Sequence, residues 1–156
     1  MLDWDKIKSK TSAFYDNATQ KMRQYTPESF SKEKKFVNAL VISLALMTMA
    51  DKKAETNEVT ASIDLLQEIN EIIDLDMVTD AIELYEIHIE DLENALNSNV
   101  KWTLAIAKLL SEIGKVKPYP EYPPMIENLL DYISQSDGKL DPLELEMKGK
   151  ILSAIK

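Results

Sequence analysis

Hydrophobic residues recur along this chain at spacings of three and four, which is the period of an amphipathic α-helix. The pattern predicts helices over about residues 2–25, 30–50, 59–73, 78–96, 102–113, 125–134 and 142–155. No run of residues shows the alternation of polar and apolar positions that is typical of a half-buried strand. The sequence therefore predicts an all-α fold of about seven helices, in a single domain over residues 1–156.

The sequence also predicts which helix is buried, where one helix begins and which segment connects the two halves. The helix over 30–50 is apolar almost all round, so we expect it to be central and buried. Either Asp74 or Asp76 is expected to cap the helix that begins near residue 78. Residues 115–124 contain four of the six prolines, and they are expected to form an extended connector between two halves of the domain.

A helix–acidic turn–helix pattern occurs twice, and the second copy follows the first at an offset of 86 residues. In each copy an apolar helical run ends at an aspartate, and further acids follow four and seven positions later. The two sets of acids are Asp51, Glu55 and Glu58, and Asp137, Asp141 and Glu144. The apolar positions of the flanking helices keep the same offset. We expect residues 30–69 and 116–155 to form a pseudo-two-fold repeat.

Composition narrows the chemistry that the chain can carry out. It has no cysteine, which excludes thiolate chemistry, and its three glycines do not build a phosphate-binding loop. His88 is the one histidine, which argues against a zinc site, and we expect it at the surface or half-buried on the flank of its helix. The apolar run over 37–50 is too short to span a bilayer, and residues 1–10 lack the pattern of a signal peptide. The expected location is the cytoplasm.

The charge of the chain is unevenly distributed. The formal net charge is −9, and no Lys or Arg lies between Lys53 and Lys101. Such an acidic field repels nucleic acid and attracts cations or a basic surface of a protein partner. The helix over 2–25 is basic and amphipathic, so it could contact an anionic membrane peripherally, but we expect it to dock on the domain as most such helices do.

The acidic turns have a structural interpretation. Asp141 precedes Pro142 and stands three residues before Glu144, which is the pattern of a helix N-terminus with a capping box. In the first turn Glu55 takes the cap position, where it is a poorer cap than Asp. Capping alone could therefore account for these acids.

A second interpretation is a weak cation site in each turn. Asp51 and Asp137 stand where a helix ends, and the helix dipole disfavours an anion there. The second turn has the layout of the later half of an EF-hand loop, without the first half. Ligands that are all oxygen point to Ca²⁺ or Mg²⁺. The second turn is the stronger candidate. The first turn has Lys52 at the position where the second turn has a glycine.

The paired "MAD…E" and "SDG…E" hairpins, together with the N-terminal "LDWDKIKSK", resemble the TerB tellurite-resistance family over most of the chain. The resemblance implies a seven-helix domain with internal pseudo-two-fold symmetry and acidic clusters that bind metal. By position, the residues carried over are Asp51, Glu58, Asp137 and Glu144. The resemblance also implies a stress function in tellurite, phage or colicin resistance, through a membrane-associated complex with other Ter proteins. Lys52 departs from the family pattern.

Two functional hypotheses follow. The first is a non-enzymatic domain of the TerB type that binds divalent cations and protein partners. The alternative is a purely structural helical adaptor whose acidic surface docks a basic partner without metal. We do not expect an enzyme, because the acids lie on solvent-facing turns with no apparent apolar pocket to raise a carboxyl pKa.

Overall fold

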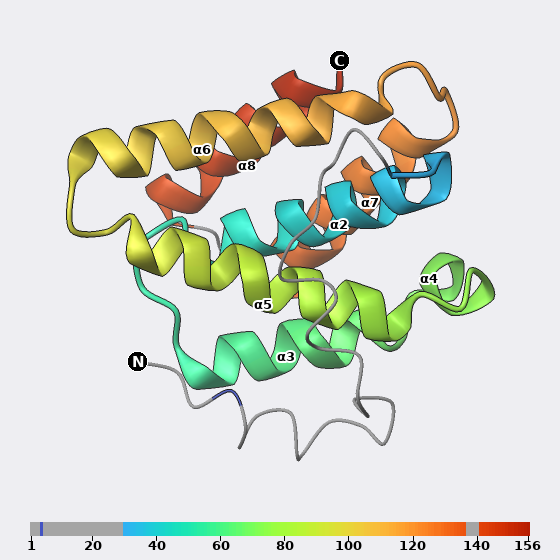
Figure 1. Ribbon diagram of the computed structural model, residues 1–156, viewed down its shortest axis with the longest axis horizontal. Helices are drawn as coiled ribbons and strands as arrows, with labels where there is room; N and C mark the ends of the chain where they lie inside the picture. The colour runs from blue at the N-terminus through green and yellow to red at the C-terminus, as the bar shows by residue number, and fades with distance from the viewer. Residues whose placement is uncertain (1–3, 5–29, 137–140) are drawn as a thin grey trace.

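The computed structural model describes Trp4, residues 30–136 and residues 141–156 of the chain (Figure 1). Seven α-helices and one short 3₁₀ helix follow one another in this part, and no strand occurs in it. They are α2 Lys32–Thr48, α3 Thr56–Leu66, α4 Asn70–Asp74, α5 Val78–Asn94, α6 Asn99–Ile113, η3 Gly114–Val116, α7 Tyr122–Ser136 and α8 Pro142–Ile155. The predicted all-α class is confirmed. The helix predicted over 2–25 lies outside the described residues, apart from Trp4.

Helix α2 is the centre of the domain, as its apolar sequence predicts. Every side chain from residue 36 to residue 48 is buried, and α2 packs against α3, α5, α6, α7 and α8. In Figure 1 it lies between α6 on one side and α5 on the other. The hydroxyls of Ser43 and Thr48 donate to the carbonyls of Ala39 and Leu44, so these polar groups are satisfied inside the helix.

The third predicted helix, over 59–73, is divided into α3 and α4 in the structure. The prediction that Asp74 or Asp76 caps the next helix is wrong. The N-cap of α5 is Met77, which makes no side-chain cap bond, and Asp74 is the last residue of α4. Asp76 has φ 56°, so it closes the turn after α4 in the left-handed region, which Asp tolerates better than most residues.

The extended connector predicted over 115–124 is also wrong. The chain continues from α6 directly into η3. The Tyr119 amide then donates to the Val116 carbonyl in a further turn, and α7 begins at Tyr122. Pro123 and Pro124 lie in the first turn of α7, where amide groups have no acceptor within the helix. Prolines are therefore compatible with a helix start, and the segment is compact rather than extended.

The described parts of the two hairpins correspond at the start of their second helices. Glu55 is the N-cap of α3 and Asp141 is the N-cap of α8, at the offset of 86 residues that the sequence predicts. The turn of the second hairpin includes residues 137–140, which are not described. The superposition of residues 30–69 on 116–155 stays a prediction.

Candidate functional site

A cleft of about 670 Å³ opens between α2, α3, α7 and the start of α8. Leu44, Met47 and Thr48 of α2 form part of its lining. Five carboxylate side chains line it, and no Lys, Arg or His is among the described residues that do so. The five are Asp51, Glu58, Asp64, Glu68 and Glu144. The cleft is therefore a concentrated patch of negative charge, which we call the acidic cleft.

The acidic cleft brings together residues of both predicted turns. Asp51 and Glu58 come from the first turn and Glu144 from the second. The sequence predicted one site in each turn, whereas the fold places these three side chains on one cleft. Glu55 and Asp141 are exposed N-cap residues that do not line it. Asp137 lies outside the described residues.

A capping box determines where α8 begins, and with it the place of Glu144. The Glu144 amide donates to Asp141 Oδ1 at 2.8 Å, and the Asp141 amide donates to Glu144 Oε1 at 3.4 Å. Pro142 occupies the first helical position. The predicted capping by Asp141 and Glu144 is confirmed, so one oxygen of each carboxylate takes part in a helix N-terminus.

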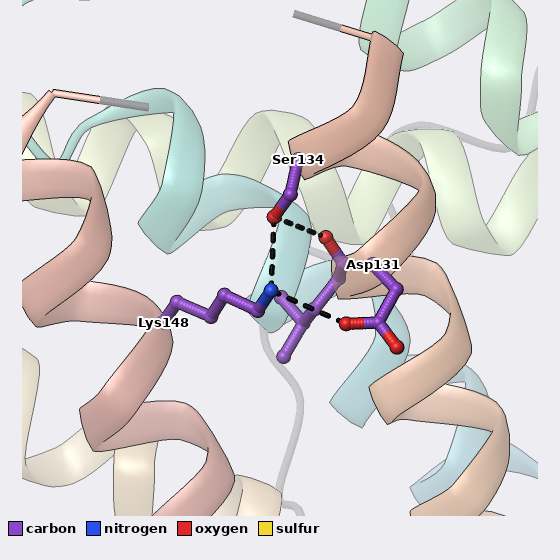
Figure 2. Close-up of polar contacts among 4 residues, drawn as sticks. Asp131, Ser134 and Lys148 are labelled. Carbon is purple, nitrogen blue, oxygen red and sulfur yellow. Dashed lines mark hydrogen bonds and ion pairs between the residues drawn. The ribbon is translucent and has the colours of Figure 1, made fainter. Parts of the chain in front are cut away.

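Lys148 attaches α8 to α7 one turn after Glu144 (Figure 2). Its ammonium lies 3.2 Å from Asp131 Oδ1 and donates to Ser134 Oγ at 3.0 Å. The Ser134 hydroxyl in turn donates to the Leu130 carbonyl at 2.8 Å. Because residues four apart lie on one face of a helix, this contact holds the face of α8 that carries Glu144 toward the acidic cleft.

The first turn is built differently. Asp51 Oδ1 accepts from the Lys53 amide at 3.0 Å, which is a local turn contact. Lys52 has φ 65°, the left-handed region where glycine is favoured, and its ammonium lies 5.5 Å from the centre of the Trp102 ring. Glu55 makes no side-chain cap bond to α3. The weaker capping expected of Glu55 is confirmed.

Hydroxyl groups form the inner wall of the acidic cleft. Thr48 and Ser62 line it, and Tyr85 of α5 lies behind them. Since the Thr48 hydroxyl donates to Leu44, it accepts from the Tyr85 hydroxyl at 2.9 Å. Burial raises the pKa of Tyr85 to about 12, and the charge of Glu58 acts in the same direction. Tyr85 is therefore a neutral donor at pH 7.

The described carboxylates of the acidic cleft are dispersed and do not form a compact metal site. Within the described residues, no group of three or more His, Cys, Asp or Glu side chains is arranged so that it could hold a metal ion. Its volume is that of a site for side chains or a small molecule. The carboxylates are spread along its length, so it can attract several positive charges at once.

The core contains a buried polar chain that was not predicted from the sequence. His88 Nε2 lies 2.8 Å from Asn38 Oδ1, and Asn38 Nδ2 donates to Glu112 Oε1 at 3.0 Å. An amide oxygen only accepts, so His88 carries its proton on Nε2. The three residues come from α5, α2 and α6, and they link these helices.

The surface or half-buried position predicted for His88 is wrong, because the side chain is completely buried. Burial, together with the smaller effect of the Lys108 charge, lowers the pKa of His88 to about 3. The imidazole is neutral at pH 7 and acts as a structural donor. The signal in the sequence was Asn38, an amide side chain within the apolar run over 37–50, because a buried amide needs a hydrogen-bond partner.

Comparison with known proteins finds no family model, no curated protein and no solved structure that matches this chain. Among the helices of the described part, none is both long and apolar enough to cross a membrane.

Proposed function

We propose that this protein is a non-enzymatic interaction domain whose acidic cleft binds the cationic side chains of a protein partner. The observation that supports the proposal is the shared cleft itself. Asp51, Glu58 and Glu144 come from two separate turns and line one space. Asp64 of α3 and Glu68, which follows α3, extend the negative charge, with no basic residue among the described lining residues.

The physical basis of binding is the addition of weak interactions. An exposed ion pair stabilises by only about 0.2–1 kcal/mol, so a single lysine would bind poorly. Several lysines or arginines held in one cleft add such contributions, and the acidic field increases the rate of encounter. Because the Debye length is about 8 Å at physiological ionic strength, the binding should weaken strongly with salt.

A second candidate is a divalent-cation site of the TerB type, with Ca²⁺ or Mg²⁺ as the ligand. The candidate ligands are Asp51, Glu58 and Glu144, which line one cleft, and oxygen ligands suit these ions. The resemblance of the two hairpin motifs to TerB adds a cytoplasmic role in tellurite or related stress resistance, with other Ter proteins as partners. The dispersed carboxylates of the described residues favour the basic partner over the ion.

A titration with tetralysine, Ca²⁺ and Mg²⁺ tests these proposals. We expect tetralysine to bind wild-type protein at low salt and to bind the Glu58→Gln variant several-fold more weakly. The matched control is Glu127→Gln, because Glu127 is exposed on α7 and does not line the cleft. Calorimetry measures all three ligands. Equal weakening of tetralysine binding by both substitutions would mean that the ligand responds to the overall charge of the protein and not to the cleft. Tight binding of Ca²⁺ alone would favour the second candidate.

A further inference from the structure

The acidic cleft continues into a second cleft of about 400 Å³. Leu65, Glu68 and Tyr132 line both, so the two clefts form one groove. The second part is more apolar and includes Phe36, Leu40, Met125 and Leu129 in its lining. Thus one end of the groove is rich in carboxylates and the other is rich in hydrophobic side chains.

The groove follows one face of the central helix. Phe36, Leu40, Leu44 and Met47 recur at three- and four-residue spacing on α2, and each lines one of the two clefts. From the first to the last of these positions, α2 rises by about 16 Å, which corresponds to about three helical turns. Helices α3 and α7 both pack on α2 and both contribute residues to the groove.

The rim of the groove carries hydrophobic side chains that are exposed or half-buried. Tyr132 is 55% exposed, and Leu65 and Met125 are half-buried. Tyrosine and methionine are enriched in protein interfaces, where they supply large contact area. A row of such residues beside carboxylates is suited to a segment that presents apolar and basic groups together.

We infer that the groove binds an amphipathic helical segment of another protein, with leucine-like side chains over Leu65, Met125 and Tyr132 and with Lys or Arg over the acidic cleft. The inference rests on the proposed function and extends it, because it names the class of partner. Charge complementarity favours a basic occupant of this kind over a second copy of this chain. A second copy of this chain would bring its own carboxylates to the groove, and the net charge of −9 opposes that association.

The test uses the full chain and a synthetic peptide of about 14 residues, long enough to fill the groove as a helix. The peptide contains only Leu and Lys, with Leu at helical spacing, and a scrambled peptide of the same composition is the control. We expect the amphipathic peptide to bind at least tenfold more tightly than the scrambled one. Fluorescence anisotropy measures the affinities, and amide chemical shifts locate the binding.

Two pairs of matched variants separate the groove from the rest of the surface. Tyr132→Ser in the groove is compared with Leu104→Ser on α6, where the leucine is 64% exposed. Glu68→Lys in the groove is compared with Glu127→Lys, which makes the same change in charge. We expect each groove variant to weaken the amphipathic peptide about tenfold, and each control variant to leave its affinity within about twofold.

The outcomes distinguish the inference from the proposed function. If tetralysine binds at the acidic cleft but the two Leu–Lys peptides bind equally and Tyr132→Ser has no effect, the inference is wrong and the proposed function stands. If none of the peptides binds, both are wrong. If sedimentation shows that the protein alone self-associates and Tyr132→Ser abolishes this, the groove belongs to a second copy and the partner inference is overturned.

Discussion

The two helical hairpins carry the same spacing of acidic residues, but different contacts hold them in place. The first hairpin pairs α2, which is buried on every side from residue 36 to residue 48, with α3. The second pairs α7 with α8 through the contacts of Lys148, and an exposed capping box begins α8. Helices α7 and α8 also bury Ile126, Leu130 and Ile151 in the core, so in this hairpin the polar contacts near the surface add to apolar packing.

The comparison shows that one spacing of carboxylates serves two kinds of local structure. In the second hairpin Asp141 caps a helix, whereas Glu55 at the equivalent position makes no side-chain cap bond. In the first hairpin Lys52 holds a left-handed conformation that glycine would adopt with less strain. What the two hairpins share is the cleft to which Glu58 and Glu144 both contribute.

The largest effect is expected in the core of the first hairpin. Asn38→Ala removes the acceptor of His88 and the donor to Glu112, both buried. The loss of unfolding free energy should be about 2–4 kcal/mol, since each buried group loses a hydrogen bond. Asn128→Ala on the exposed face of α7 should change it by less than about 0.5 kcal/mol. Urea denaturation measures both, and equal losses would contradict the importance of the buried chain.

The same polar chain predicts a dependence of stability on pH. The pKa of His88 is about 3 in the folded protein, compared with the ordinary value of 6.5 for the unfolded chain. Between about pH 3 and pH 6.5 the unfolded chain therefore binds one more proton than the folded protein. Unfolding free energy should therefore be intact above pH 6.5 and fall as pH decreases toward 3, by at most about 1.4 kcal/mol per pH unit from this residue. His88→Gln should lack this part of the slope in denaturation between pH 6 and 4.5.

The capping difference between the hairpins gives a smaller effect. Asp141→Ala should lower the unfolding free energy by about 1 kcal/mol, because it removes a helix cap. Glu55→Ala should lower it by less than about 0.5 kcal/mol, because Glu55 makes no cap bond. Thermal and urea denaturation of the two variants measure the contrast. A larger loss of unfolding free energy for Glu55→Ala than for Asp141→Ala would contradict the conclusion that Asp141 is the stronger helix cap.

The smallest expected effect concerns the left-handed residue of the first turn. Lys52→Gly should be more stable than Lys52→Ala by about 0.5–1 kcal/mol, after allowance for the greater freedom of glycine in the unfolded chain. Both variants lose the contact with Trp102, so their difference isolates the backbone conformation. Indistinguishable denaturation midpoints would mean that the turn relaxes at no cost.

Local patterns in the sequence predicted much of the fold. The period of the apolar residues gave the helix positions, and the continuous apolar surface of α2 gave its central place. Asp141, Pro142 and Glu144 follow one another at capping-box spacing, so their contacts depend only on neighbouring residues. The division of the third helix and the helical start at Pro123 and Pro124 were missed, because tertiary packing decides between permitted local conformations.

The candidate site was less predictable because it is a tertiary feature. Nothing in the spacing of Glu58 and Glu144 says that two turns of the chain share a cleft. The partnership of His88, Asn38 and Glu112 likewise joins three helices that are far apart in sequence. Such contacts follow from how whole helices pack, and a single sequence does not encode them in a readable pattern.

The central claim is that both acidic turns contribute to one binding cleft, and amide chemical shifts during a tetralysine titration test it most directly. In the wild-type protein, amides near Glu58 and near Glu144 should shift together with one affinity. In Glu144→Gln the affinity reported by amides near Glu58 should also fall, because both side chains line the same space. Two turns that titrate with separate affinities, each unaffected by substitution in the other, would contradict the account.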